Sequence, residues 1–152
     1  MRFDKLTTKF QQALADAQSI AVGNDQQFIE PLHVLQALLE QDDGGSVSLL
    51  QRAGVNVPPL KAAVAKAIGR LPKVEGHGGD VSIGRDLNSL LNVTDREAQK
   101  RGDQFIASEM FLLALSEDKG EAGRLLKENG LTRKALEAAI EAVRGGASVG
   151  SQ

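Results

Sequence analysis

The sequence contains no cysteine, no tryptophan and no tyrosine, and only five of its 152 residues are phenylalanine. Without cysteine the chain forms neither disulfides nor thiolate metal sites, which is typical of a protein that works in a reducing cytoplasm. The core must then be built from leucine, alanine, valine and isoleucine. Small alanine side chains let helices approach closely, so this composition predicts an all-α fold.

Several functional signals are also missing. The net charge of −2 argues against a nucleic-acid-binding protein, because such proteins present a basic face. No apolar run approaches the roughly 20 residues of a membrane span, and the opening MRFDKLTTKF lacks the apolar stretch of a secretory signal. The patterns GxxxxGK[ST], HExxH and GxSxG are absent. We therefore expect a cytoplasmic protein without catalytic activity, metal or cofactor, and without nucleic-acid or membrane partners.

The sequence repeats itself. The stretch DQQFIEPLHVLQALL begins at Asp25, and GDQFIASEMFLLALS follows 77 positions later, beginning at Gly102. Two copies are too few for a solenoid, so we predict two halves related by a pseudo-twofold axis. The expected organisation is one domain over 1–147, with repeat one at about 8–71, a loop at 72–84 and repeat two at about 85–147. A flexible linker is expected to start at 148–152.

Each half is predicted to contain four helices, about eight in total. The first helix shows apolar residues at helical spacing from Phe10 to Ala21, with a capping box at Thr8 and Gln11. The second helix is expected to begin at Pro31, and its equivalent to follow an N-cap at Ser108.

Glycines mark the ends of the later helices. A short third helix should run from Ser46 to Gly54, and its equivalent should stop at Gly130. The fourth helix is expected over about 58–70, and its partner over 132–144 with Gly145 as its stop. Charges of both signs at helical spacing in DREAQKRGD, 95–103, predict a solvated face.

Two histidines, His33 and His77, are present. They allow two interpretations, a metal-binding pair or a surface histidine plus a loop histidine. The second is favoured, because no spacing typical of metal ligands surrounds them.

The two copies differ in polarity at several equivalent positions. If the polar residues of copy one face water, their apolar counterparts in copy two form an exposed patch, which is typical of interaction sites. The exchanged pairs are Asp16 and Val93, His33 and Met110, and Gln36 and Leu113. The alternative is that an imperfect twofold buries Met110 and Leu113 in packing.

One exchange runs in the opposite direction, because Leu32 becomes Glu109. Glu109 would either stabilise the start of its helix or form a polar rim beside the patch, and Asp103 would join that rim. The residues alone thus predict an α-helical binding module whose ligand is apolar and peptide-like.

Three long stretches resemble a known family: the first 39 residues, RLPKVEGHGGD and AQKRGDQFIASEMFLLAL. They are similar to the Clp N-terminal repeat domains of bacterial disaggregase chaperones, and the similarity covers essentially the whole chain. The resemblance implies two four-helix repeats. It also implies a parent AAA+ ATPase, active in the stress response, which forms a hexamer and refolds aggregated proteins with the DnaK system. ATP and Mg would bind ATPase modules that this chain does not contain.

The resemblance also implies a substrate surface. Its polar positions match Thr7, Asp103 and Glu109, and its apolar groove includes the positions of Val93, Glu97 and Met110. Glu97 departs from the apolar residue expected there, and Thr7 is alternatively an N-cap.

The expected function is recognition of unfolded or aggregated polypeptides through a small apolar groove with a polar rim. The comparison of the two copies adds Leu113 to the groove. The alternative is a module that docks an adaptor protein for a Clp-type unfoldase. We expect the isolated domain to be monomeric.

Overall fold

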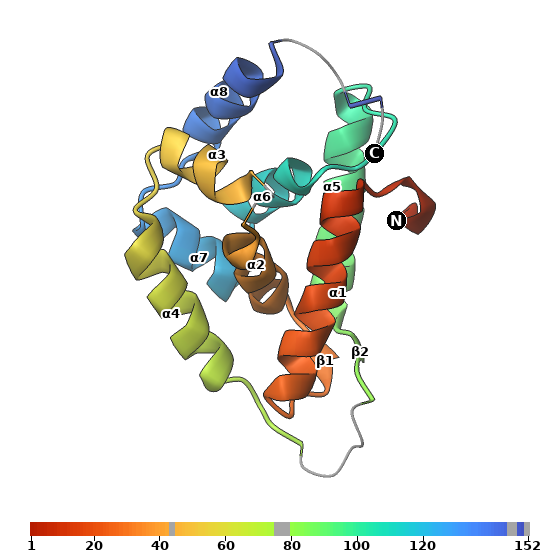
Figure 1. The fold of residues 1–152 in the computed structure, drawn as a ribbon, viewed down its shortest axis with the longest axis vertical. Coiled ribbons are helices and arrows are strands. Elements are labelled where there is room, and N and C mark those ends of the chain that lie inside the picture. The colour runs from red at the N-terminus through yellow and green to blue at the C-terminus, as the bar shows by residue number, and fades with distance from the viewer. Residues whose placement is uncertain (43–44, 75–79, 146–148, 151–152) are drawn as a thin grey trace.

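The computed structural model describes residues 1–42, 45–74, 80–145 and 149–150, and within them the chain is mostly helical (Figure 1). The elements are η1 (Phe3–Lys5), α1 (Thr8–Gly23), β1 (Phe28–Ile29), α2 (Pro31–Glu40), α3 (Ser46–Arg52), α4 (Val57–Gly69), β2 (Ser82–Ile83), α5 (Arg85–Lys100), α6 (Ser108–Ser116), α7 (Glu121–Glu128) and α8 (Arg133–Arg144). The all-α prediction and its eight α-helices are confirmed for the described residues.

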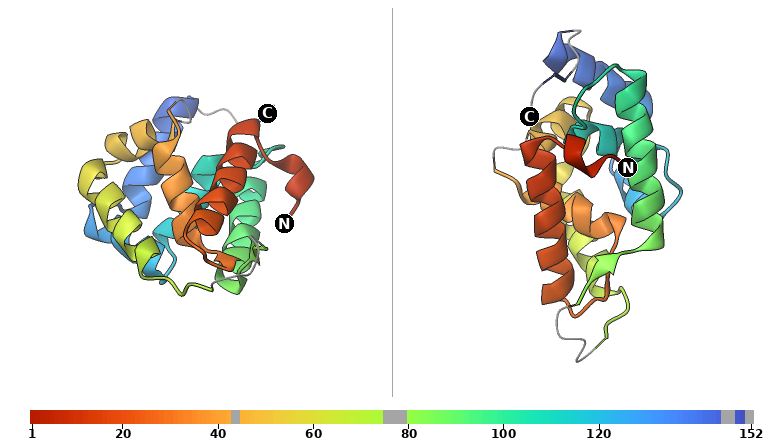
Figure 2. Two further views of the ribbon diagram at one scale, coloured as in Figure 1. Left: turned by 60° about the horizontal axis from the view of Figure 1, so that its bottom comes forward. Right: turned by 90° about the vertical axis from the view of Figure 1, so that its right-hand side faces the viewer.

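The packing of the helices follows a pseudo-twofold arrangement. In the first half α1 packs on α2, and in the second half α5 packs on α6. Across the halves α3 packs on α8, and the equivalent pair, α7 and α4, makes the equivalent contact. Figures 1 and 2 show α1 and α5 running along the long axis of the molecule, with α2 and α6 nearer its centre. Two four-helix units therefore share one core.

Two short pairings of extended backbone repeat the same symmetry. Strand β1 pairs with β2 in parallel, with Ile29 opposite Ile83. A parallel bridge also joins Leu6 to Ile106. In the repeat, Leu6 is equivalent to Ile83 and Ile106 is equivalent to Ile29. The segment 72–84, predicted to be loop, contains β2. A two-residue strand leaves no periodic signal in the sequence.

The axis of the pseudosymmetry passes close to Gly54 and Gly130. Both glycines adopt positive φ angles, 92° and 106°, as the predicted helix stops require. A Cβ atom on Gly130 would lie 3.0 Å from the carbonyl oxygen of Gly54, so the two turns touch.

Two of the predicted helix starts, those of α1 and α6, differ in detail. The N-cap of α1 is Thr7, whose Oγ1 accepts a hydrogen bond from the Phe10 N–H at 3.2 Å. The predicted Thr8–Gln11 capping box is wrong, because the Gln11 side chain donates instead to the Leu6 carbonyl. Ser108 is the first residue of α6 rather than its N-cap. The start at Pro31 is confirmed, and α8 begins at Arg133, one residue after the predicted Thr132, which is its N-cap.

The interpretation of His33 as a surface residue is wrong, because its side chain is fully buried. His77 lies outside the described residues. Within the described ranges no group of three or more His, Cys, Asp or Glu side chains is placed to hold a metal ion. No helix in the part of the chain that the structure describes is both long enough and apolar enough to cross a membrane.

Candidate functional site

The predicted apolar patch of copy two is not on the surface. Met110 and Leu113 are fully buried in the core, and Val93 is half-buried against it. The prediction that Met110 and Leu113 face solvent is wrong because its premise fails at His33, which is also buried. Their burial is the packing alternative stated above. A direct binding role for these two side chains would require them to leave the core.

The predicted solvated face at 95–103 is confirmed for Arg96 and Lys100, which are exposed. It is wrong for the three acidic residues, Asp95, Glu97 and Asp103, which are buried in ion pairs. Asp95, on α5, accepts hydrogen bonds from the Arg2 guanidinium and from Gln99. Burial raises the pKa of Asp95, but these hydrogen bonds outweigh it and hold the pKa at about 2. The N-terminal segment is thus attached to α5 by a permanent charge pair.

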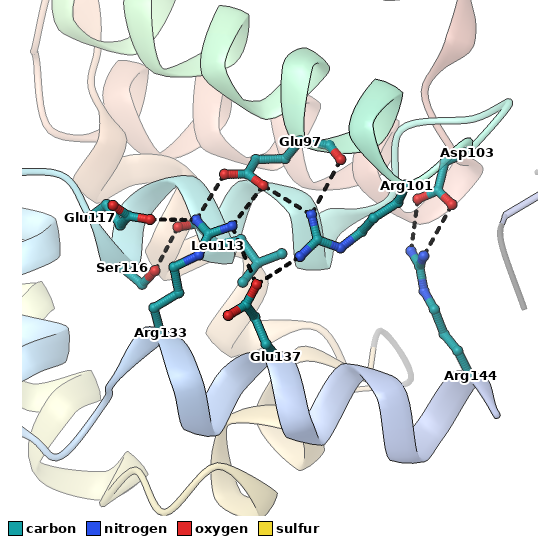
Figure 3. Close-up of polar contacts among 9 residues, drawn as sticks. All are labelled: Glu97, Arg101, Asp103, Leu113, Ser116, Glu117, Arg133, Glu137 and Arg144. Carbon is teal, nitrogen blue, oxygen red and sulfur yellow. Dashed lines mark hydrogen bonds and ion pairs between the residues drawn. The ribbon is translucent and has the colours of Figure 1, made fainter. Parts of the chain in front are cut away.

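Glu97 joins α5 to α8. Its side chain is 6% exposed and accepts two hydrogen bonds from Arg133, at 2.8 and 2.9 Å, and one from Arg101 at 2.9 Å (Figure 3). The Arg133 hydrogen bonds lower the pKa of Glu97 and outweigh the opposing effect of burial. The departure from an apolar residue is therefore compensated, because Glu97 is buried with its charge paired on two sides.

Asp103 and Glu109 share one partner, Arg144, at the end of α8. The Asp103 side chain is 0% exposed and receives two hydrogen bonds from Arg144, both at 3.0 Å. Figure 3 shows the Arg144 guanidinium facing both carboxylate oxygens. Glu109 accepts from Nε of the same guanidinium at 2.7 Å. Burial lowers the pKa of Arg144, but its bonds to the two carboxylates outweigh burial and raise it. Glu109 therefore belongs to a charged cluster and not only to the start of α6.

Thr7 lies beside the segment that connects Asp103 to α6. The Thr7 N–H donates to the Ile106 carbonyl at 3.0 Å, and the Ile106 N–H donates to the Lys5 carbonyl at 2.6 Å. Its hydroxyl caps α1, as described above. The structure thus brings the three predicted polar residues, Thr7, Asp103 and Glu109, to the stretch that leads into α6.

A cleft of about 670 Å³ opens beside Glu109, between α3, the start of α6 and the end of α8. It is lined by Gly45, Ser46, Ser48, Leu49, Gln51, Arg52, Ser108, Glu109 and Val143. Val143 presents an apolar surface there and is 63% exposed. The buried Ser108 hydroxyl in the same wall has no hydrogen-bond partner among the described residues. The cleft combines apolar area with polar groups, which is typical of ligand sites.

Sequence reasoning missed the contribution of α3 and Val143 to this cleft. Val143 continues the apolar spacing of Leu136 and Ile140, and the repeat aligns it with Ala67, which is buried. No signal in the sequence distinguishes it from a core residue. A smaller cleft of about 330 Å³ lies between the halves at the start of α2 and of α7, which are equivalent to α6 and α3.

Comparison with known proteins places the chain in a family. The profile of the Clp repeat (R) N-terminal domain matches residues 5–129. Chaperone protein ClpB of Vibrio cholerae is 50% identical over 149 residues, and that of Pseudomonas putida is 49% identical over 149 residues. Each match covers 98% of this chain and 17% of the relative, so the chain spans about a sixth of these proteins.

Solved structures show the same fold. The Hsp104 N-terminal domain from Candida albicans superposes with a TM-score of 0.84 at 20% identity, covering 97% of this chain and 96% of the other. The structure described as a complex of the ClpV N-domain with VipB peptide gives a TM-score of 0.69 at 20% identity, covering 95% and 89%. The matched region is the non-catalytic helical domain of ClpB-type chaperones. This chain therefore belongs to the Clp repeat (R) N-terminal domain family and is similar in sequence to ClpB chaperones.

Proposed function

We propose that this domain recognises unfolded or aggregated polypeptides for a ClpB-like disaggregase. The single observation that carries the proposal is the cleft between α3, α6 and α8, which pairs apolar area at Val143 and Leu49 with a charged wall at Glu109. An exposed stretch of a misfolded chain would place apolar side chains against the apolar area and hydrogen-bonding groups against the charged wall.

The predicted site residues take different roles in this proposal. Glu109 forms the polar wall of the cleft, whereas Thr7 and Asp103 lie outside its lining. Thr7 contacts the segment that leads into α6, and Asp103 binds Arg144, the partner of Glu109. Val93 lies half-buried on α5. Glu97, Met110 and Leu113 act indirectly, because their burial holds α5, α6 and α8 in the positions that shape the cleft.

The proposal for the whole protein rests on the ClpB relatives. The parent would be a cytoplasmic AAA+ hexamer of the stress response, with ATP and Mg bound outside this chain, that refolds proteins together with the DnaK system. A single small cleft binds weakly, and six copies around one ring raise the effective concentration of sites.

The first test is an amide NMR titration that measures the affinity of this chain for reduced and carboxymethylated α-lactalbumin, a permanently unfolded protein. Val143→Ser should weaken binding about fivefold, because burying a valine contributes on the order of 1 kcal/mol. Val22→Ser is the matched control, since Val22 is an exposed valine on α1 that does not line the cleft. Equal affinities for the two variants would reject the cleft.

Docking of a dedicated adaptor is the second candidate. It is favoured by the complex of a ClpV N-domain with VipB peptide, in which a domain of this fold holds a segment of a named partner. An adaptor would bind saturably as a folded protein, whereas the domain would be indifferent to unfolded chains. Amide shifts that appear with one folded partner, and not with the carboxymethylated protein, would support this role.

A further inference from the structure

Val149 lies against the loop between α5 and α6. Its N–H donates a hydrogen bond to Oδ1 of Asp103 at 2.8 Å. Its carbonyl oxygen accepts from the N–H groups of Gln104 and Phe105, at 2.7 and 3.2 Å. One peptide residue is thus held through both of its main-chain polar groups.

The three contacts use only the main chain of the bound residue. Any residue except proline has the same N–H and carbonyl groups, so the contacts impose no choice of side chain. Recognition of extended segments by main-chain hydrogen bonds, with side-chain selection left to neighbouring pockets, is the chemistry of strand addition.

The acceptor in this arrangement is fixed in advance. Both oxygens of Asp103 are bound by Arg144, and the Asp103 side chain is fully buried. Ile106, which follows the two donor residues, is held by its hydrogen bonds to the N-terminal segment at Lys5 and Thr7. A site whose groups are already oriented loses little conformational freedom when a ligand binds.

We propose that Asp103 Oδ1 and the N–H groups of Gln104 and Phe105 form a main-chain clamp for an extended polypeptide, and that Val149 occupies it here in place of substrate. The inference rests on the proposed function and specifies how the substrate is recognised. Residues inside a helix or sheet already use their N–H and carbonyl groups, so the clamp selects for absence of folded structure.

The clamp adjoins the cleft, because Arg144 binds both Asp103 of the clamp and Glu109 of the cleft wall. A bound chain would be held by its main chain at the clamp and by its side chains in the cleft. Val149 and substrate compete for the same three groups, so the apparent affinity for substrate is reduced by the fraction of molecules in which Val149 is docked.

The test is Val149→Pro in this chain, with reduced and carboxymethylated α-lactalbumin as the probe. Proline has no N–H and cannot donate to Asp103, so the clamp is released. We expect binding to be tighter by about threefold or more, since a clamp that is mostly occupied reduces the apparent affinity by at least that factor. Val149→Ala is the matched control, because it keeps both main-chain groups and should bind as the wild type does.

Amide NMR provides the second readout. In Val149→Pro the Gln104 and Phe105 signals should shift before the probe is added and move again when it binds. If their signals and the affinity both match the wild type, the clamp is rejected while the proposed function stands. Release of the two amides without any gain in affinity likewise rejects competition at the clamp. If neither wild type nor variant binds the probe, the proposed function fails together with the inference.

Discussion

At the scale of single residues, His33 is the clearest case of a side chain whose environment sets its chemistry. Its Nδ1 accepts a hydrogen bond from the Glu30 N–H at 2.8 Å, so Nε2 must carry the proton that it shares with Gln26 Oε1 at 2.7 Å. Gln26 in turn donates to the Ile68 carbonyl at 2.6 Å. A buried neutral imidazole thus connects the start of α2 to the end of α4.

This network predicts a loss of stability in mild acid. Burial lowers the pKa of His33 from 6.5 to about 4, so between these values only the unfolded chain takes up the proton. The titration of His33 therefore leaves the free energy of unfolding unchanged above pH 6.5. As the pH falls towards 4 it lowers the free energy of unfolding, by about 3 kcal/mol in total.

Urea unfolding of the wild type and of His33→Gln across this pH range measures the effect. The glutamine variant lacks the titrating group, and its free energy of unfolding should vary less with pH. Parallel curves for the two proteins would show that His33 does not carry the dependence.

At the scale of elements, α7 packs closely against the end of α6 because residue 123 is glycine. A Cβ atom at Gly123 would lie 2.7 Å from the Leu115 carbonyl oxygen and closer still to that of Asp118. Both obstacles are backbone atoms, which cannot move aside as the end of a flexible side chain does. The approach of α7, and hence the position of the neighbouring α4, depends on this missing methyl group.

Gly123→Ala should therefore lower the free energy of unfolding by about 1–3 kcal/mol, which is the usual effect of overpacking. Gly69→Ala is the matched control. Gly69 is also helical, but a Cβ atom there meets nothing within 4 Å, so alanine should be neutral or stabilising by up to about 1 kcal/mol. Thermal denaturation followed by circular dichroism compares the two variants. A Gly123→Ala protein as stable as the wild type would contradict the close approach.

At the scale of the whole molecule, the two repeats share one core and do not form separate units. The rings of Phe10 on α1 and Phe111 on α6 lie 5.8 Å apart, and both side chains are fully buried. Two further contacts join the repeats, because α3 of the first packs on α8 of the second and α4 of the first packs on α7 of the second. Neither half can bury its apolar surface alone.

We expect a single cooperative unfolding transition that Phe10→Ala weakens in both halves at once. Truncation of a buried phenylalanine costs about 3–5 kcal/mol. Amide hydrogen exchange should lose protection by the same factor in α2 and in α6, although the substitution lies in α1. Phe3→Ala is the control, because Phe3 is about half exposed and should change stability by less than about 0.5 kcal/mol. Loss of protection confined to the first half would show that the repeats unfold independently.

The helices and their equivalence between the two halves could be predicted from the sequence because their signals are local. Pro31 fits only the first turn of a helix, Gly145 adopts the left-handed conformation that ends one, and the repeat identifies equivalent helices without any tertiary information. The binding role of the three polar residues, which the family resemblance implies, stays a prediction. Thr7, Asp103 and Glu109 do meet at the stretch leading into α6.

Burial and charge pairing were decided only in three dimensions. Every residue of α6 except Glu109 is buried, and a helix surrounded on all sides has no polar face from which burial can be predicted. The partner of Asp103, Arg144, lies 41 positions away, so their pairing depends on how α8 crosses the molecule. The sequence by itself therefore determined which segments are helices and that they occur twice. The tertiary structure decided which side chains remain at the surface to bind a ligand, because exposure depends on neighbours that are distant in the chain.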